Sequence, residues 1–140
     1  MKIMLVEDEK ITRKTLTDIL KKENYDVNSF GDGTEALNEL KQNNFDVVIT
    51  DLRLPGTNGL DILKAAKEIN SKTVVIIITA YATVETAIES LKLGAYDYLL
   101  KPFSPEQLLS ILKHIEQLSK VLNENEKLKS RLELFEKKTI

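Results

Sequence analysis

The sequence of 140 residues contains no cysteine, no tryptophan, a single histidine and no long apolar run. Without cysteine the chain can form neither disulfides nor thiolate metal sites, a composition that fits a reducing compartment. All apolar runs are too short to cross a membrane, and the few apolar residues before Glu7 cannot form a signal peptide core. We therefore expect a soluble, cytoplasmic protein with no membrane partner. His114, the single histidine, lies outside every motif and is expected to be a surface or helix-packing residue.

An excess of charge of one sign is also missing. The 20 Lys and Arg residues against 22 Asp and Glu residues leave a formal net charge of −2, which favours neither a polyanionic partner nor a membrane surface. The chain has no basic tract or basic recognition helix of the kind that binds nucleic acid. It also has no glycine-rich P-loop. We expect that this chain alone neither binds DNA nor hydrolyses ATP.

Short apolar runs alternate with amphipathic segments along the first part of the chain. The strongest runs are Lys2–Val6, Phe45–Ile49 and Val74–Ile78, with a shorter one at Tyr98–Leu100 and a weaker, edge-like one at Tyr25–Phe30. Between them apolar residues recur at helical spacing. Five repeats of strand then helix predict an α/β fold with a doubly wound, five-stranded parallel sheet. We expect the flavodoxin-like strand order 2-1-3-4-5.

The last helix has a clear beginning and no end signal. Ser104 is a good N-cap, Pro105 suits the first helical position, and Gln107 completes a capping box. Since no glycine or proline follows, the helix is expected to run to near Lys138, about 50 Å at 1.5 Å per residue. We predict that residues 119–140 form a helical linker that projects from the domain.

The projecting helix carries an apolar stripe at heptad spacing, interrupted at one position by Asn125. Its members are Leu118, Val121, Leu128, Leu132 and Phe135. A buried asparagine at such a position fixes the register of two-stranded coiled coils. The stripe predicts a homodimer through the C-terminal helix, and the alternative is a solvated, fraying terminal helix.

Chemically useful residues stand where the predicted strands end. Glu7 and Asp8 follow the first strand, Asp51 follows the third, Thr79 the fourth and Lys101 the fifth. The carboxyl ends of parallel strands form the ligand crevice of this fold class. When three carboxylates converge there, either the pKa of one of them rises or the cluster binds a hard cation. Mg²⁺ suits such ligands.

Asp51 is the best candidate nucleophile, because a carboxylate can accept a phosphoryl group to give an acyl phosphate. Lys101 could neutralise the incoming oxygens, and the Thr79 hydroxyl could donate a hydrogen bond to one of them. Each residue also has a purely structural alternative. Asp8 or Glu9 could cap the first helix, Lys101 could only pair with an acid, and Thr79 is an ordinary strand residue.

The sequence also bears on two other functional classes, an aspartate-nucleophile phosphatase and a flavin or nucleotide carrier. Aspartate-nucleophile phosphatases place a second acid two residues after the nucleophile, whereas this chain has Arg53 there, so it should turn over esters poorly. A flavin or nucleotide carrier needs a glycine-rich first turn for its phosphate, and the first strand here ends in Glu7 and Asp8.

Residues 1–118 resemble the receiver domain of two-component response regulators. The motifs that carry the resemblance are Glu7-Asp8, Asp51 with the following Leu52–Gly59, the Thr79-Ala80 step and the run Gly94–Phe103. The resemblance implies a switch rather than an enzyme: a sensor histidine kinase supplies the phosphoryl group, and the domain catalyses only its own phosphorylation and dephosphorylation.

The resemblance also implies a role for each site residue. Asp51 is the phosphoacceptor, and Glu7, Asp8 and Asp51 hold Mg²⁺ together with the backbone carbonyl of Arg53. Lys101 binds the phosphoryl group, and the peptide bond from Lys101 to Pro102 is cis. Thr79 and Tyr98 form the switch pair.

The stretch Thr79–Ala87 and the long last helix are similar to receivers of NtrC-type activators, which work with sigma-54 RNA polymerase. In those proteins an ATPase domain and a helix-turn-helix domain follow the linker. This chain ends at Ile140, before either could begin. We therefore expect a fragment of a longer regulator of sigma-54-dependent transcription, or a stand-alone receiver that acts by protein–protein interaction.

Overall fold

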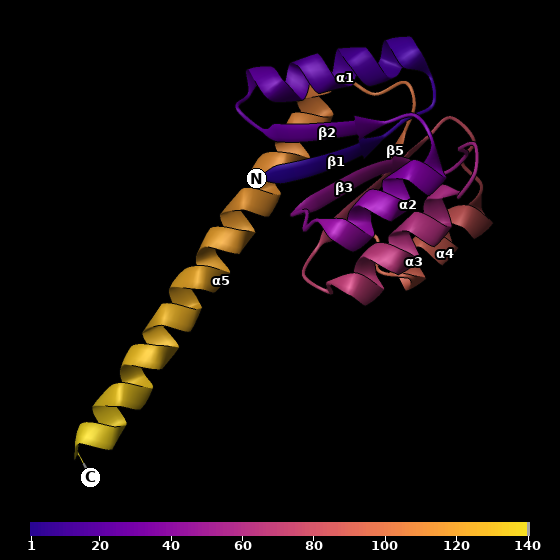
Figure 1. Ribbon diagram of the computed structural model, residues 1–140. Helices are drawn as coiled ribbons and strands as arrows, with labels where there is room; N and C mark the ends of the chain where they lie inside the picture. The colour runs from indigo at the N-terminus through magenta and orange to yellow at the C-terminus, as the bar shows by residue number, and fades with distance from the viewer. Residues whose placement is uncertain (140) are drawn as a thin grey trace. The chain divides into compact units, whose positions relative to one another are not determined.

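Strands and helices alternate strictly along the chain (Figure 1). The computed structural model describes residues 1–139, with side chains up to residue 137. The elements are β1 (Lys2–Val6), α1 (Lys10–Lys22), β2 (Asp26–Phe30), α2 (Gly33–Gln42), β3 (Val47–Asp51), α3 (Gly59–Ile69), β4 (Val74–Thr79), α4 (Val84–Lys92), β5 (Asp97–Leu100) and α5 (Pro105–Thr139).

The strands form one parallel sheet in the order β2-β1-β3-β4-β5, as the sequence predicted. The central strands β1, β3 and β4 are almost fully buried, which explains their continuous apolar sequences. Strand β3 begins and ends two residues later than the predicted run Phe45–Ile49. Its last residue, Asp51, is still paired with Ile78 of β4.

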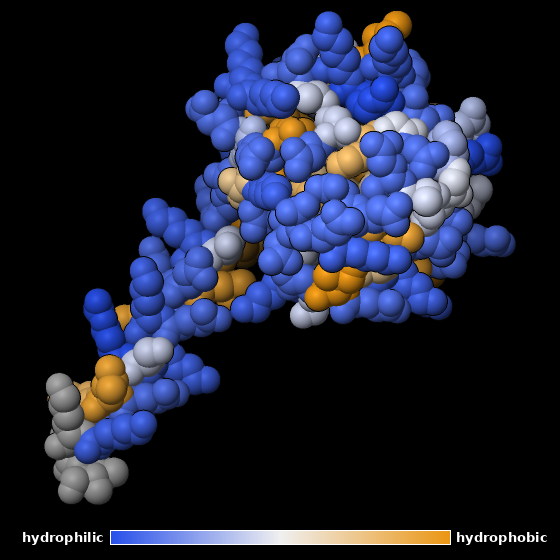
Figure 2. Space-filling view, in the orientation of Figure 1, coloured by the Kyte–Doolittle hydropathy of each residue, from blue (hydrophilic) through white to orange (hydrophobic). Residues whose placement is uncertain are grey.

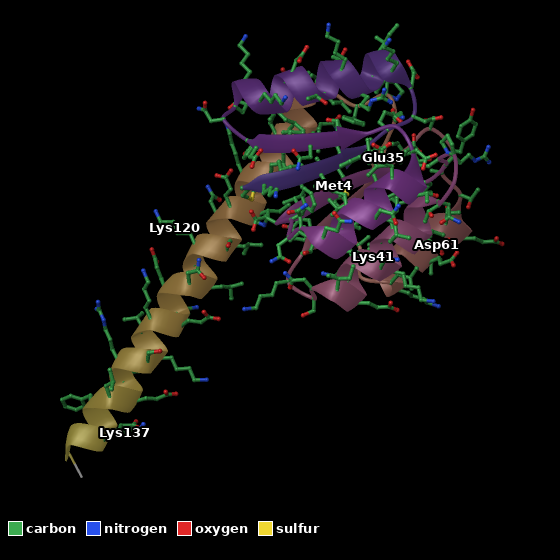
Figure 3. The ribbon with its side chains drawn as sticks, viewed as in Figure 1. Met4, Glu35, Lys41, Asp61, Lys120 and Lys137 are labelled. Atoms are coloured by element: carbon green, nitrogen blue, oxygen red, sulfur yellow. The ribbon has the colours of Figure 1, made fainter. Side chains whose placement is uncertain are left out.

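Side chains alternate between the two faces of the sheet, and helices cover both faces (Figure 1). On one face Met4 and Val6 pack with Ala36 and Leu40 of α2 and with α3 residues such as Leu63. Figure 3 shows Met4 between the sheet and these helices. This packing therefore holds the carboxyl ends of the central strands in place.

Three helices begin at side-chain caps that close the loops along the carboxyl edge of the sheet. Asp32 accepts hydrogen bonds from the first turn of α2, and Asn58 accepts one from Asp61 of α3. Thr83 and Thr86 form a reciprocal capping box at the start of α4. Such caps accept hydrogen bonds from the first backbone N–H groups of a helix, which have no acceptor within the helix itself.

Two compact units make up the chain, one of residues Met1–Pro105 and one that begins at Glu106. Helix α5 continues to Thr139, about as far as predicted. From Glu116 to Lys137 every side chain is exposed, and apolar residues lie among the charged ones on this helix (Figure 2). Lys120 and Lys137 extend away from the helix axis (Figure 3). Within the described residues, no helix has the length and apolar character that a membrane span requires.

Candidate functional site

Three carboxylates meet at the carboxyl edge of the sheet, as the sequence predicted. Ligand oxygens of Glu7, Asp8 and Asp51 lie within 4.8 Å of one another. Glu7 and Asp8 follow the last residue of β1, and Asp51 ends the neighbouring strand β3. Glu7 and Asp51 are buried, whereas Asp8 is exposed. The cluster is therefore a partly buried acidic site with one open side.

Lys101 supplies a counter-charge to two of these carboxylates. Its Nζ atom donates to Asp51 Oδ2 at 2.8 Å and also to Glu7 Oε1. Burial alone would lower the pKa of Lys101, but the hydrogen bonds to Asp51 and Glu7 outweigh it and raise that pKa. The ammonium group therefore stays charged at neutral pH. The peptide bond to Pro102 is cis, as the resemblance implied.

Glu7 is the carboxylate with a buried oxygen that lacks a hydrogen-bond partner within the protein, its Oε2 atom. Burial raises the pKa of Glu7 to about 7, although Lys101 opposes that shift. A buried polar oxygen without a partner is costly, and a bound cation would remove that cost. Together with the open side at Asp8, the donor set of carboxylate oxygens fits Mg²⁺.

The loop from β3 to α3 holds Asp51 in place. Asp51 Oδ1 accepts a hydrogen bond from the backbone N–H of Arg53 at 3.2 Å, so both carboxylate oxygens have partners. Gly59 begins α3 directly beside the strand, where a Cβ atom would come within 2.1 Å of the Asp51 carbonyl oxygen. The absence of a side chain at Gly59 thus allows the loop to fold back over the strand end.

The predicted switch residues lie on neighbouring strands. Thr79 ends β4, is buried, and accepts a hydrogen bond from the Tyr81 N–H at 3.0 Å. It pairs with Leu100 of β5, and Tyr98 lies two residues earlier on that strand. The half-buried Tyr98 places its hydroxyl 3.1 Å from Thr86 Oγ1 of the α4 capping box.

Two features of the site could not be predicted from the sequence. The guanidinium of Arg53 lies 4.1 Å from the centre of the Tyr81 ring, a cation–π contact between the loops after β3 and β4. The second feature is the contact between Thr86 and Tyr98, since the position of Thr86 in a helix gives no indication of it. Conversely, Glu9 precedes α1 without a capping side-chain bond, so the capping alternative does not apply to it.

The comparisons with known proteins agree on one family. The model of the response regulator receiver domain matches residues 3–113. The regulatory protein AtoC of Escherichia coli (strain K12) is 35% identical over 123 residues, which cover 88% of this chain and 27% of AtoC. The chain thus spans about a quarter of the length of this relative.

Solved structures show the same fold. A CheY-like receiver domain protein from Methanospirillum hungatei JF-1 matches with a TM-score of 0.81 and 28% identity, over 85% of this chain and 96% of that one. The beryllofluoride-activated NtrC4 receiver domain, solved as a dimer, matches with a TM-score of 0.76 and 34% identity, over 81% of this chain and 94% of that one.

The acidic cluster leads to a testable prediction. Asp8→Asn removes one charge from the exposed side of the cluster and should weaken Mg²⁺ binding by about tenfold, or ~1.4 kcal/mol. Titration calorimetry measures this directly. Asp26→Asn is a matched control, because Asp26 is exposed at the amino end of β2, on the opposite edge of the sheet. Equal Mg²⁺ affinity in both variants would contradict a metal site at Asp8.

Proposed function

Because the chain belongs to the response regulator receiver domain family, we propose that Asp51 accepts a phosphoryl group from a sensor histidine kinase in a Mg²⁺-dependent reaction. The observation that carries the proposal is the arrangement of Asp51 beside Lys101, Glu7 and Asp8, with Lys101 Nζ at 2.8 Å. The domain is a signalling switch that modifies itself, and the phosphorylated carboxylate is its product.

The reaction needs a nucleophile and a way to bear negative charge. An oxygen of Asp51 attacks phosphorus, the bond to the donor nitrogen breaks, and that nitrogen keeps the electron pair, which leaves an acyl phosphate. Lys101 then faces the incoming phosphoryl oxygens as well as the carboxylates. Bound Mg²⁺, held by Glu7, Asp8, Asp51 and the Arg53 carbonyl, would supply further positive charge to these oxygens.

A phosphatase function is not supported by the residue two positions after Asp51. An ester hydrolase of the aspartate-nucleophile class would need an acid there to protonate its leaving group. The chain has Arg53, whose guanidinium stacks on Tyr81. The acyl phosphate is therefore proposed as a signal rather than as an intermediate of turnover.

The proposed output is control of sigma-54-dependent transcription, inside the cytoplasm, by a longer regulator. Similarity to AtoC and to the NtrC4 receiver supports this class. In this proposal residues 1–118 are the receiver and residues 119–140 the linker, and neither binds nucleic acid directly. A stand-alone receiver that acts through protein contacts is the alternative output.

The chemistry predicts a specific adduct. Incubation with acetyl phosphate and Mg²⁺ should add one phosphoryl group to the chain, and chelation of the metal should prevent it, because the crowded carboxylates cannot accept a dianionic group unaided. Asp51→Asn should remove the adduct entirely. Intact-mass spectrometry reads the result, with Asp26→Asn as the matched control that keeps full labelling. Full labelling of Asp51→Asn would falsify the assignment.

The switch is proposed to couple Thr79 to Tyr98. In the structure Thr79 is held by the Tyr81 N–H, and Tyr98 is held by Thr86. A phosphoryl group on Asp51 offers the Thr79 hydroxyl a stronger, charged acceptor. When that hydroxyl turns inward, space opens that the Tyr98 ring can occupy. The surface formed by α4 and β5 then changes between two packed states.

Thr79→Ala separates phosphorylation from this response. The variant should still accept a phosphoryl group, because Asp51 and its cation partners are intact, but the α4 and β5 surface should no longer change. NMR shifts of that surface before and after phosphorylation provide the measurement. Thr73→Ala changes the threonine that directly precedes β4, at the end of the strand away from Asp51, and should respond like the wild type. Full shift changes in phosphorylated Thr79→Ala would exclude the coupling.

We propose the exposed part of α5 as a homodimer interface. The stripe residues Leu118, Val121, Leu128, Leu132 and Phe135 are between 42% and 65% exposed. In a parallel pair, Asn125 would face its symmetry mate, which satisfies both amides. The flanking charges also suit that orientation: Glu124 would face Lys129 of the other helix, and Arg131 would face Glu136. An antiparallel pair would place Asn125 against Leu128 instead.

Truncation tests the location of the dimer. A chain that ends after Leu118 should be a monomer in analytical ultracentrifugation, while the full chain should be a dimer, because the apolar stripe lies almost wholly beyond that point. The truncated chain should still accept a phosphoryl group from acetyl phosphate, since every proposed site residue precedes Pro105. A truncated chain that remains equally dimeric would place the interface on the receiver.

A further inference from the structure

Arg13 connects helix α1 to the loop that carries the two leading carboxylates. It lies in the first turns of α1 and is half-buried. Its Nη1 atom donates to the carbonyl oxygen of Glu7 at 2.8 Å and lies 3.4 Å from that of Asp8. The guanidinium therefore contacts the backbone of both residues rather than their carboxylates. Its position leaves the carboxylate oxygens available for a cation.

The guanidinium is also confined from the other side. A Cβ atom on Gly31 would come within 2.5 Å of Arg13 Nη1 and 3.1 Å of its Cζ. Gly31 directly follows Phe30, whose carbonyl accepts the Glu7 N–H at 3.0 Å. The Glu7 backbone is thus held at its N–H by β2 and at its carbonyl by Arg13. No side chain at Gly31 competes for the space that the guanidinium fills.

We propose that Arg13 is a positioning residue for the Mg²⁺ site. Its charge-assisted hydrogen bonds fix the peptide units of Glu7 and Asp8, and these units set the directions of the two carboxylates. Partners that orient metal ligands from behind affect metal affinity by about ten- to a hundredfold. The inference rests on the proposed Mg²⁺ site and assigns a function to a residue outside the carboxylate and lysine set.

Electrostatics alone predicts the opposite effect, which makes the proposal easy to test. A guanidinium this close to a cation site repels the cation, so its simple removal should strengthen Mg²⁺ binding. If Arg13 positions the ligands, its removal should weaken Mg²⁺ binding. The sign of the change therefore distinguishes the two effects, without any dependence on phosphorylation.

The experiment is a Mg²⁺ titration of the full, unphosphorylated chain by calorimetry. Arg13→Ala should weaken binding about tenfold. Lys14→Ala removes the same charge from an exposed neighbouring position on α1 and should leave affinity unchanged or slightly increased. Arg13→Lys keeps the charge and one donor group, so it should recover part of the lost affinity. A structural role in helix α1 alone would not produce this pattern.

Gly31→Ala provides an independent route to the same effect. The added methyl group should displace the guanidinium while its charge remains, and Mg²⁺ binding should weaken as in Arg13→Ala. In the double variant the two losses should not add, because both act through one contact. In metal-free protein, NMR shifts of the Asp8 and Glu9 amides should move in both single variants and stay in place in Lys14→Ala.

The outcomes separate this inference from the function on which it rests. If the wild-type chain binds no Mg²⁺, the proposed function fails, and this inference with it. If the wild type binds Mg²⁺ and Arg13→Ala binds it equally or more tightly, only the positioning role is overturned. Additive losses in the double variant would overturn it as well. Should Arg13→Ala fail to fold, Gly31→Ala and Arg13→Lys decide the question.

Discussion

The crowding of three carboxylates at one edge of the sheet is the constraint on which the site depends. Their oxygens lie within 4.8 Å of one another, and of these three carboxylates Lys101 forms ion pairs with Glu7 and Asp51. One ammonium group cannot balance three carboxylates, and burial makes the imbalance more costly. The raised pKa of Glu7 and its unpaired Oε2 express that imbalance. The site is therefore arranged to take up further positive charge, which a divalent cation would supply.

A rigid scaffold is needed to hold like charges this close together. The central strands provide it, because β1 and β3 are paired with neighbours on both sides and buried on both faces. Asp51 remains inside the ladder of β3, where it pairs with Ile78. Neither carboxylate-bearing segment can relax away from the other without the loss of sheet hydrogen bonds or core packing. The apolar core thereby maintains the electrostatic strain of the site.

The sequence predicted the strand order and the convergence of Glu7, Asp8, Asp51 and Lys101, because both follow from continuous apolar runs and from where these runs stop. The ends of β3 were misplaced by two residues, since hydrophobicity marks burial and not the hydrogen-bonded ladder that continues to Asp51. The contacts of Arg53 with Tyr81 and of Tyr98 with Thr86 were not predictable. They depend on loop conformations and side-chain rotamers, which carry no periodic signal.

The buried strands and the side-chain contacts at their ends differ in how easily they change, which bears on how a charge at Asp51 could affect the surface formed by α4 and β5. Thr79 ends a buried strand, but its hydroxyl is engaged by the loop residue Tyr81, whose ring also stacks on Arg53. Tyr98 is engaged through Thr86, which caps α4 together with Thr83. Each of these hydroxyl contacts is a single hydrogen bond that can be exchanged for another while the buried central strands keep their pairing. A ligand can shift such an equilibrium only by differential contact with its two states, and the proposed switch assigns that contact to the Thr79 hydroxyl.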